Sequence, residues 1–217
     1  PYWGDEPIWD ASTTVHNPML DQDGRVWITA RARAPQDVPA FCQEGSDHPS
    51  AQVFPLGRSG RHLGVYDPDT EVYTPINTCF GTHHLMFAED ADNTLWTSGG
   101  GRVIGWLNTR QYLETGDAVA AQGWTPFILD TNGNGRRDED YVEPDQAVDP
   151  SRDKRINSGF YAVAPAPDGS VWGSNLSYPG AVVRLMPGDN PSVTALTEYY
   201  ELPLDANGDP IEGFSPR

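Results

Sequence analysis

Three stretches of the chain share one pattern of hydrophobic and polar positions. Each begins with a short run of mainly apolar residues, continues through a turn rich in Asp, Asn or Gly, and returns with an aliphatic residue followed by Trp. The stretches are residues 16–29, 84–98 and 160–174. Apolar alternation suits a pleated strand, and the turn residues supply the positive φ that a tight hairpin needs. The pattern therefore predicts three copies of an antiparallel hairpin.

Further strand patterns follow these hairpins. Residues 99–107 and 180–185 are predicted to form third strands, and residues 71–76 and 197–202 fourth strands. Four antiparallel strands per repeat make the blade of a β-propeller. The sequence thus predicts an all-β fold, a β-propeller of four-stranded antiparallel blades, of which residues 1–217 supply about three.

A Trp recurs with each hairpin, at positions 27, 96 and 172, so we expect these side chains in the core between sheets. Their spacings of 69 and 76 residues exceed the roughly 40–45 residues of a compact blade. We therefore expect insertions at about residues 32–61 and 109–158 within one partial propeller domain. The second insertion includes a short helical pattern and an acidic loop.

Three blades do not close a ring, because propellers need about four to eight. Residues 213–217 resemble the residues that open the other repeats. We expect the remaining propeller blades, or another chain, to complete the ring. A small open stack of sheets is the alternative.

The charge balance narrows the choice of partners. The chain has 14 Lys and Arg against 31 Asp and Glu, a formal net charge of −17. Such a surface repels polyanions, so we expect no nucleic-acid partner. No run approaches the roughly 20 apolar residues of a membrane-spanning helix, so we also expect no membrane insertion. The motifs of serine hydrolases, P-loop proteins, dinucleotide-binding proteins and HExxH metalloproteases do not occur.

The two cysteines, Cys42 and Cys79, lie in polar, turn-like segments and lack the CxxC spacing of zinc or redox motifs. A single disulfide is the simplest interpretation, and it favours an oxidising compartment, extracellular or periplasmic. Two independent reduced thiols are the alternative.

Residues 130–143 match the first three-quarters of an EF-hand calcium loop. Oxygen ligands stand at positions 1, 3 and 5, Gly at 6, a backbone carbonyl at 7 and a carboxylate at 9. The corresponding residues are Asp130, Asn132, Asn134, Gly135, Arg136 and Asp138. Position 12 is Tyr141 rather than Glu, although Asp140 and Glu143 stand near enough to substitute. We predict a structural Ca²⁺ site in a surface loop; a solvated acidic loop without metal is the alternative.

The repeats resemble the streptogramin (virginiamycin B) lyase-like group of β-propellers. The resemblance touches about half the chain, and the same repeat is similar to gluconolactonase-like and NHL-type propellers. It implies a propeller fold and a lyase-like activity. The insertions are longer than is usual in the family, and the third repeat has Phe160 where the second has His84. The matching segments are residues 16–18, 23–29, 67–70, 82–85, 95–98 and 103–106.

Histidines are the candidate catalytic residues. His16 and His84 stand at equivalent starts of the innermost strand, which lines the channel of a propeller, and His83 is adjacent. The three could meet near the channel mouth and act as general bases or bind a second divalent metal ion. Alternatively, a His at the start of a strand only bonds a neighbouring backbone. Adjacent strand residues point to opposite faces, so we expect at most one of His83 and His84 to face the channel.

Two further histidines, His48 and His62, lie in or beside the first insertion, and we expect them on the surface.

Two functions follow from these features. The first is a secreted or periplasmic lyase-like enzyme that abstracts a proton from an ester, lactone or ring substrate, with His84 or His16 as base and a divalent cation at the leaving oxygen. The second is a non-catalytic propeller that binds a protein, glycan or surface partner through its insertions. A small-molecule or glycan ligand is compatible with either.

Overall fold

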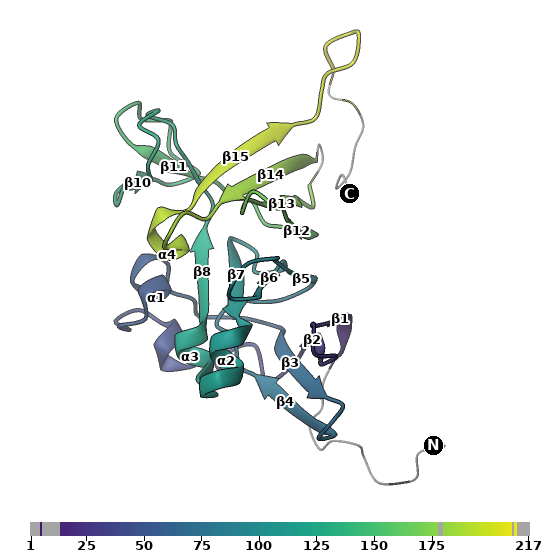
Figure 1. The fold of residues 1–217 in the computed structure, drawn as a ribbon. Helices are drawn as coiled ribbons and strands as arrows, with labels where there is room; N and C mark the ends of the chain where they lie inside the picture. The colour runs from purple at the N-terminus through teal and green to yellow at the C-terminus, as the bar shows by residue number, and fades with distance from the viewer. Residues whose placement is uncertain (1–4, 6–13, 178–179, 210, 212–217) are drawn as a thin grey trace.

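The computed structural model describes residue 5, residues 14–177, residues 180–209 and residue 211. β-Strands dominate it, and three four-stranded antiparallel meanders follow one another along the chain (Figure 1). The all-β class and the four-stranded antiparallel sheets that the sequence predicts are confirmed.

The first sheet has the strand order β1-β2-β3-β4. Gly24, with a φ of 84°, lies in the β1–β2 turn as the hairpin pattern predicts. The β2–β3 connection carries two short helical segments and corresponds to the expected first insertion. The elements are β1 (His16–Leu20), β2 (Val26–Ala30), η1 (Ala40–Cys42), α1 (Pro49–Val53), β3 (His62–Asp67) and β4 (Val72–Ile76).

The second sheet has the order β5-β6-β7-β8, and its first turn contains Asn93 at a φ of 50°. Its fourth strand, β8, lies inside the segment that we expected to be an insertion, because two short helices separate it from β7. The elements are β5 (Leu85–Phe87), β6 (Thr94–Thr97), β7 (Val103–Asn108), α2 (Thr109–Thr115), α3 (Ala118–Ala121) and β8 (Gln122–Pro126).

The third meander, β12-β13-β14-β15, belongs to a seven-stranded sheet, because β9 pairs in parallel with β15 and continues through β11 to β10. The short strands β9 to β11 frame the acidic loop of the second insertion. The elements are β9 (Ile128–Leu129), β10 (Tyr141–Val142), β11 (Asp153–Arg155), β12 (Val163–Pro165), β13 (Val171–Ser174), β14 (Ala181–Met186), α4 (Pro191–Thr194) and β15 (Leu196–Glu201).

Successive sheets pack through the recurring tryptophans. Trp27 is fully buried in a core shared by the first and second sheets, and Trp96 lies in a core shared by the second and third. Trp172 differs, since it is half-buried and stacks on Tyr200 of its own sheet at 5.8 Å between ring centroids. The expectation of a core position was therefore wrong for Trp172, because no further sheet of the described residues packs on its face.

The first strands of the three sheets lie side by side, since β5 contacts both β1 and β12. Polar side chains link them. The Asn17 side-chain oxygen accepts a hydrogen bond from the Leu85 N–H at 2.8 Å, and Asn17 has a φ of 45°. Ser98 Oγ donates to the Tyr161 carbonyl at 2.6 Å. These links bring the starts of the first strands of the three sheets to one place.

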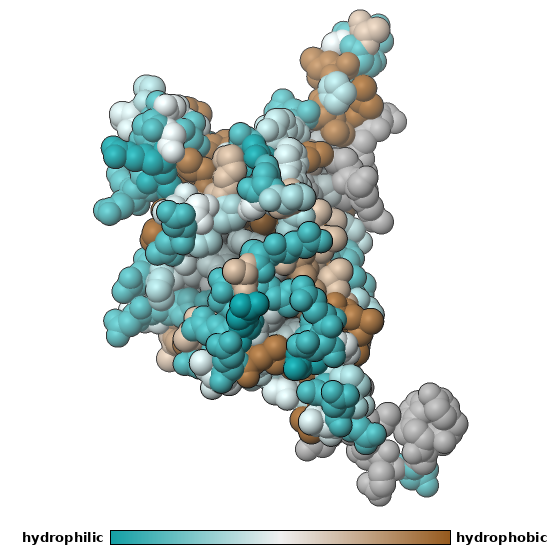
Figure 2. Space-filling view, in the orientation of Figure 1, coloured by the Kyte–Doolittle hydropathy of each residue, from teal (hydrophilic) through white to brown (hydrophobic). Residues whose placement is uncertain are grey.

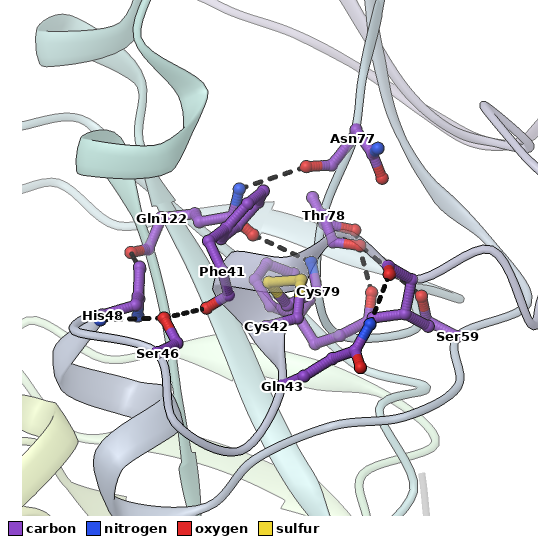
Figure 3. Close-up of a disulfide and its surroundings, with 12 residues drawn as sticks. Phe41, Cys42, Gln43, Ser46, His48, Ser59, Asn77, Thr78, Cys79 and Gln122 are labelled. Atoms are coloured by element: carbon purple, nitrogen blue, oxygen red, sulfur yellow. Dashed lines mark hydrogen bonds between the residues drawn. A yellow bond between two sulfur atoms is a disulfide. The ribbon is translucent and has the colours of Figure 1, made fainter.

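A disulfide joins Cys42 and Cys79, as the sequence predicts (Figure 3). It ties the first insertion to the segment after β4, and both residues are fully buried. The Cys79 N–H donates to Gln122 Oε1 at 2.9 Å, which connects the bridge to β8. The first insertion is thus held against the second sheet.

Among the described residues, no helix has both the length and the apolar character needed to cross a bilayer. Hydrophilic residues cover most of the face drawn in Figure 2.

Candidate functional site

Three histidines meet where the first strands begin. His16 opens β1, and His83 and His84 directly precede β5. The His83 N–H donates to the Ser98 carbonyl, and the Tyr161 N–H makes the equivalent bond to the Ser174 carbonyl, each at 2.8 Å. Tyr161 therefore occupies in the third sheet the place that His83 occupies in the second.

The three imidazoles form one cluster. Ring centroids are 4.5 Å apart for His16 and His83, 5.3 Å for His16 and His84, and 4.2 Å for His83 and His84. One ring nitrogen from each lies within 4.8 Å of the others. The Tyr161 ring lies 5.1 Å from both the His83 and the His84 ring.

The expectation that His83 and His84 point to opposite faces was wrong. Their Nδ1 atoms are 3.0 Å apart. The alternation rule holds within a pleated strand, but β5 begins only at Leu85 and the chain bends at His83. The bend lets both rings turn to the same side.

Hydrogen bonding leaves ring nitrogens free in this cluster. His84 Nδ1 lies 2.7 Å from the Tyr161 carbonyl, so an N–H at that position donates to it and leaves Nε2 as an acceptor. His16 Nε2 is buried and has no partner among the described residues. Metal-binding imidazoles commonly donate their second N–H to a backbone carbonyl, and neutral imidazole suits Zn, Cu, Fe and Ni. The donor set thus fits a divalent transition metal ion.

The pKa of His83 is lowered to about 4, mainly by burial and then by the neighbouring His84, His16 and Arg61. The ring is therefore neutral at neutral pH. A neutral ring can bind a metal ion, but a group with so low a pKa is a weak general base.

The acidic loop is held by hydrogen bonds between its own residues. Asp130 accepts three backbone hydrogen bonds, from the N–H groups of Gly133, Asn134 and Gly135, at 2.8–3.1 Å. The side-chain amides of Asn132 and Asn134 donate to the two oxygens of Asp138. The Arg136 N–H donates to Asn134 Oδ1 at 2.9 Å. In these bonds the side-chain oxygens of loop positions 1, 3, 5 and 9 accept from groups of the loop itself, so they fit a metal-free acidic loop as well, and the Ca²⁺ site stays a prediction.

Asp140 and Glu143, which we expected to replace the missing ligand at loop position 12, pair with arginines instead. Asp140 is exposed and forms an ion pair with Arg152 at 3.1 Å, and Glu143 pairs with Arg155. Asp153, at the start of β11, lies beside the loop instead: its Oδ2 accepts from the Asp138 N–H at 2.8 Å. Asp153 is fully buried and its Oδ1 has no partner among the described residues. Burial, followed by the nearby charges of Asp138 and Asp130, raises the pKa of Asp153.

The two remaining histidines have structural roles. His62 is fully buried, which contradicts its expected place on the surface, because Ala32 and Ser59 of the first insertion fold over it. His48 is half-buried, caps α1 by accepting from the Ser50 N–H, and stacks on Trp124 at 4.7 Å.

Two site residues escaped the sequence analysis, Tyr161 and Asp153. His83 and Tyr161 each lie two positions before the first strand of their sheet. An alignment of the repeats on His83 rather than on His84 would therefore have found Tyr161. Asp153 carries no local signal, because 14 residues separate it from Asp138.

No family model matches the chain, and no curated protein matches it. The solved structures similar to it include the following two. One is PorZ, described as an essential bacterial surface component of the type-IX secretion system of Porphyromonas gingivalis, with 14% identity and a TM-score of 0.46 over 97% of this chain and 23% of that chain. The other is a candidate 6-phosphogluconolactonase from Bacteroides uniformis, with 12% identity and a TM-score of 0.37 over 91% of this chain and 46% of that chain.

The chain thus spans about a quarter of one of these proteins and under half of the other. Neither neighbour belongs by its description to the streptogramin lyase-like group, so that resemblance stays a prediction.

Proposed function

We propose that the chain is part of a β-propeller that binds a divalent transition metal ion through His16, His83 and His84 at the mouth of its channel. The observation that carries this proposal is the convergence of three imidazoles from two adjacent sheets, with ring nitrogens within 4.8 Å and a buried, unpartnered His16 Nε2. A buried polar atom without a partner is costly, and a metal ion would satisfy it.

The propeller architecture is supported by the repeating contact between sheets. Trp27 and Trp96 occupy the same place in consecutive sheets and are buried by the next sheet, whereas Trp172 occupies that place in the third and is half-buried. We propose that a further four-stranded sheet, from the same protein or from a partner chain, covers Trp172 and continues the ring.

The reaction that suits such a site is lyase-like cleavage of an ester, lactone or ring. A base removes a proton from the carbon next to the C–O bond, a C=C bond forms, and the C–O bond breaks with its electron pair on the departing oxygen. A divalent ion would stabilise the charge on that oxygen. A histidine whose available ring nitrogen binds the metal ion cannot also take the proton, so in this reaction His84 or His16 acts as the base and the other two histidines hold the ion.

A non-catalytic binding function is the second candidate. The pKa of His83, about 4, removes that ring as a general base at neutral pH and leaves only His84 and His16 for the enzyme function. With a binding function, the metal site has a structural role, and the disulfide-tied first insertion contacts a protein, glycan or surface partner.

The acidic loop is proposed to hold a structural Ca²⁺ ion. Its ligand set is Asp130, Asn132, Asn134, the Arg136 carbonyl and Asp138, with Asp153 in place of Asp140. The support is the unpartnered, fully buried Asp153 oxygen beside two other carboxylates.

An extracellular or periplasmic location is proposed on the buried disulfide, which persists in oxidising compartments.

The metal proposal is tested by removing metal on a chelating resin and titrating the full chain with Zn²⁺ in a calorimeter. We expect one high-affinity site, weakened at least about tenfold by His16→Ala or His84→Ala, since even outer-shell changes cost that much. His48→Asn is the control, because it keeps the acceptor that caps α1 and lies outside the cluster. Equal affinities in all four proteins, or no binding in the wild type, would contradict the proposal.

The enzyme proposal is tested separately by screening the metal-loaded protein against esters and lactones and repeating the assay on His16→Ala and His84→Ala. Turnover that is undiminished in both variants would remove these residues as catalytic. If no ester or lactone is turned over and a pull-down with the protein retrieves a defined partner, the binding function is favoured.

A further inference from the structure

A pocket of about 930 Å³ opens next to the histidine cluster and has a charge opposite to that of the rest of the chain. His83 and Tyr161 border it. Three arginines, Arg31, Arg61 and Arg102, also line it, and none of the described residues that line it is Asp or Glu. Carboxylates outnumber Arg and Lys by 31 to 14 in the whole sequence, so the absence of acids from the lining of this pocket is notable.

The topology brings the three arginines together. Arg31 follows the last residue of β2 and Arg61 precedes the first residue of β3, and these strands are antiparallel neighbours. Arg102 precedes β7 in the second sheet. All three lie at the end of the sheets where His83 precedes β5. The positive charge of Arg61 reaches the cluster, since it is one cause of the lowered pKa of His83.

Within the part of the chain that the structure describes, these arginines form no ion pair, whereas four other arginines do. Arg25, Arg152, Arg155 and Arg184 each form an ion pair with at least one carboxylate. The Arg102 guanidinium lies over the Phe54 ring at 5.5 Å, which fixes the position of its stem without neutralising its charge.

The pocket wall supplies neutral donors as well. Ser158 is only 5% exposed, lines the pocket, and its hydroxyl has no hydrogen-bond partner among the described residues. Gly99, with a φ of 89°, also lines it, and a Cβ there would lie 2.7 Å from the His83 Cβ, so Gly is required for the wall to approach the histidine. A buried hydroxyl without a partner needs a ligand or an ordered water.

We propose that this pocket binds a small organic anion through a carboxylate or phosphate group. An oxyanion in the pocket can accept charge-assisted, often bidentate hydrogen bonds from the guanidinium groups that line it. The positive pocket in a negative molecule also attracts anions selectively to this one place. The site adjoins the proposed metal site but does not need it, because the arginines and Ser158 are not metal ligands.

The test uses the oxidised full chain, freed of metal on a chelating resin, in a Tris buffer. Inorganic phosphate and succinate are titrated by calorimetry, with sodium chloride at matched ionic strength as the reference. The variants are Arg61→Gln and Arg102→Gln. Arg110→Gln is the matched control, since Arg110 is exposed on α2 outside the pocket and has no ion pair among the described residues.

We expect at least one oxyanion to bind, and binding to weaken about tenfold in each pocket variant and to be unchanged in Arg110→Gln. Phosphate-only binding identifies a phosphate-bearing ligand, and succinate-only binding a carboxylate. Neither anion binding better than chloride, or equal affinities in all four proteins, would overturn the proposal. Anion binding that appears only after Zn²⁺ loading and ignores the arginine variants would also overturn it, since the anion would then be a metal ligand.

The two proposals fail independently. If the protein binds phosphate but not Zn²⁺, the metal-site proposal is contradicted and the anion-pocket proposal stands. If it binds Zn²⁺ but neither phosphate nor succinate, only the anion-pocket proposal is contradicted.

Discussion

At the scale of single residues, burial is the main cause of the lowered pKa values of His62 and His83. His62 is enclosed between Ala32 and Ser59, and its Nδ1 accepts the Ala32 N–H at 3.0 Å. Protonation of Nδ1 would turn this acceptor into a second donor facing an N–H. Burial first, and then the positive charge of Arg33, lowers the pKa of His62 to about 4.

The lowered pKa of His62 makes stability depend on pH. The unfolded chain protonates this ring near pH 6.5, whereas the folded chain resists protonation down to about pH 4. The contribution is therefore present above pH 6.5 and is lost as the pH falls toward 4, by up to about 3 kcal/mol. Urea unfolding between pH 7 and pH 4 measures it. His62→Asn keeps an acceptor for the Ala32 N–H and cannot titrate, so its curve should be flatter; parallel curves would contradict this assignment.

At the scale of elements, the sequence predicted the hairpins and the first insertion well and the second insertion poorly. The Asp-Gly and Asp-Asn turns and the Trp on each return strand are local signals, and the hairpins β1–β2, β5–β6 and β12–β13 follow them. β8 escaped prediction because α2 and α3 separate it from β7, so the strand has no turn signal beside it. The pairing of β9 with β15 joins residues 129 and 197, and no local pattern carries such a contact.

In the acidic loop, too, the residues close together in sequence could be predicted and the residue brought in from a later strand could not. Loop positions 1 to 9 follow from spacing, whereas the acid beside them comes from β11. We expect Ca²⁺ at about 100 times its dissociation constant to stabilise the wild-type chain by about 2.7 kcal/mol. Asp153→Asn should remove most of that gain and keep an acceptor for the Asp138 N–H, and Asp145→Asn, an exposed change in the same insertion, should not. Thermal unfolding with and without Ca²⁺ measures both. A Ca²⁺ response equal in the wild type and Asp153→Asn would rule out this ligand, and no response in the wild type would rule out the site.

The disulfide is the element that holds the first insertion. It closes 37 residues, for which the chain-entropy model gives a stabilisation of about 4 kcal/mol. The double variant Cys42→Ala, Cys79→Ala should therefore lose about 2–4 kcal/mol of unfolding free energy in urea. Reductant should shift the wild type toward the variant and leave the variant unmoved. A wild type and double variant of equal stability would show that the bridge does not stabilise the fold.

At the scale of the whole molecule, the first and second sheets each pack on the next sheet through a Trp, and among the described residues no further sheet packs on the third. Trp96 sits in the core between sheets, whereas Trp172 is half-buried and is held by Tyr200 and Arg184 of its own sheet.

Replacing each Trp tests this difference. Trp96→Ala should cost about 3–5 kcal/mol of unfolding free energy, as for a large core residue. Trp172→Ala should cost clearly less in this chain, because fewer contacts are lost. Urea unfolding of the two variants gives the comparison. An equal loss of unfolding free energy in both would contradict the proposal that a further sheet covers Trp172 in the complete ring.

The central claim is that the inner strands of the first two sheets bring His16, His83 and His84 onto one metal ion. X-ray absorption at the zinc edge, on the full chain loaded with one equivalent of Zn²⁺, tests it most directly. The account predicts three imidazole nitrogens at about 2.0–2.1 Å, falling to two in His84→Ala. A shell of oxygen ligands alone, or a spectrum that His84→Ala leaves unchanged, would contradict it.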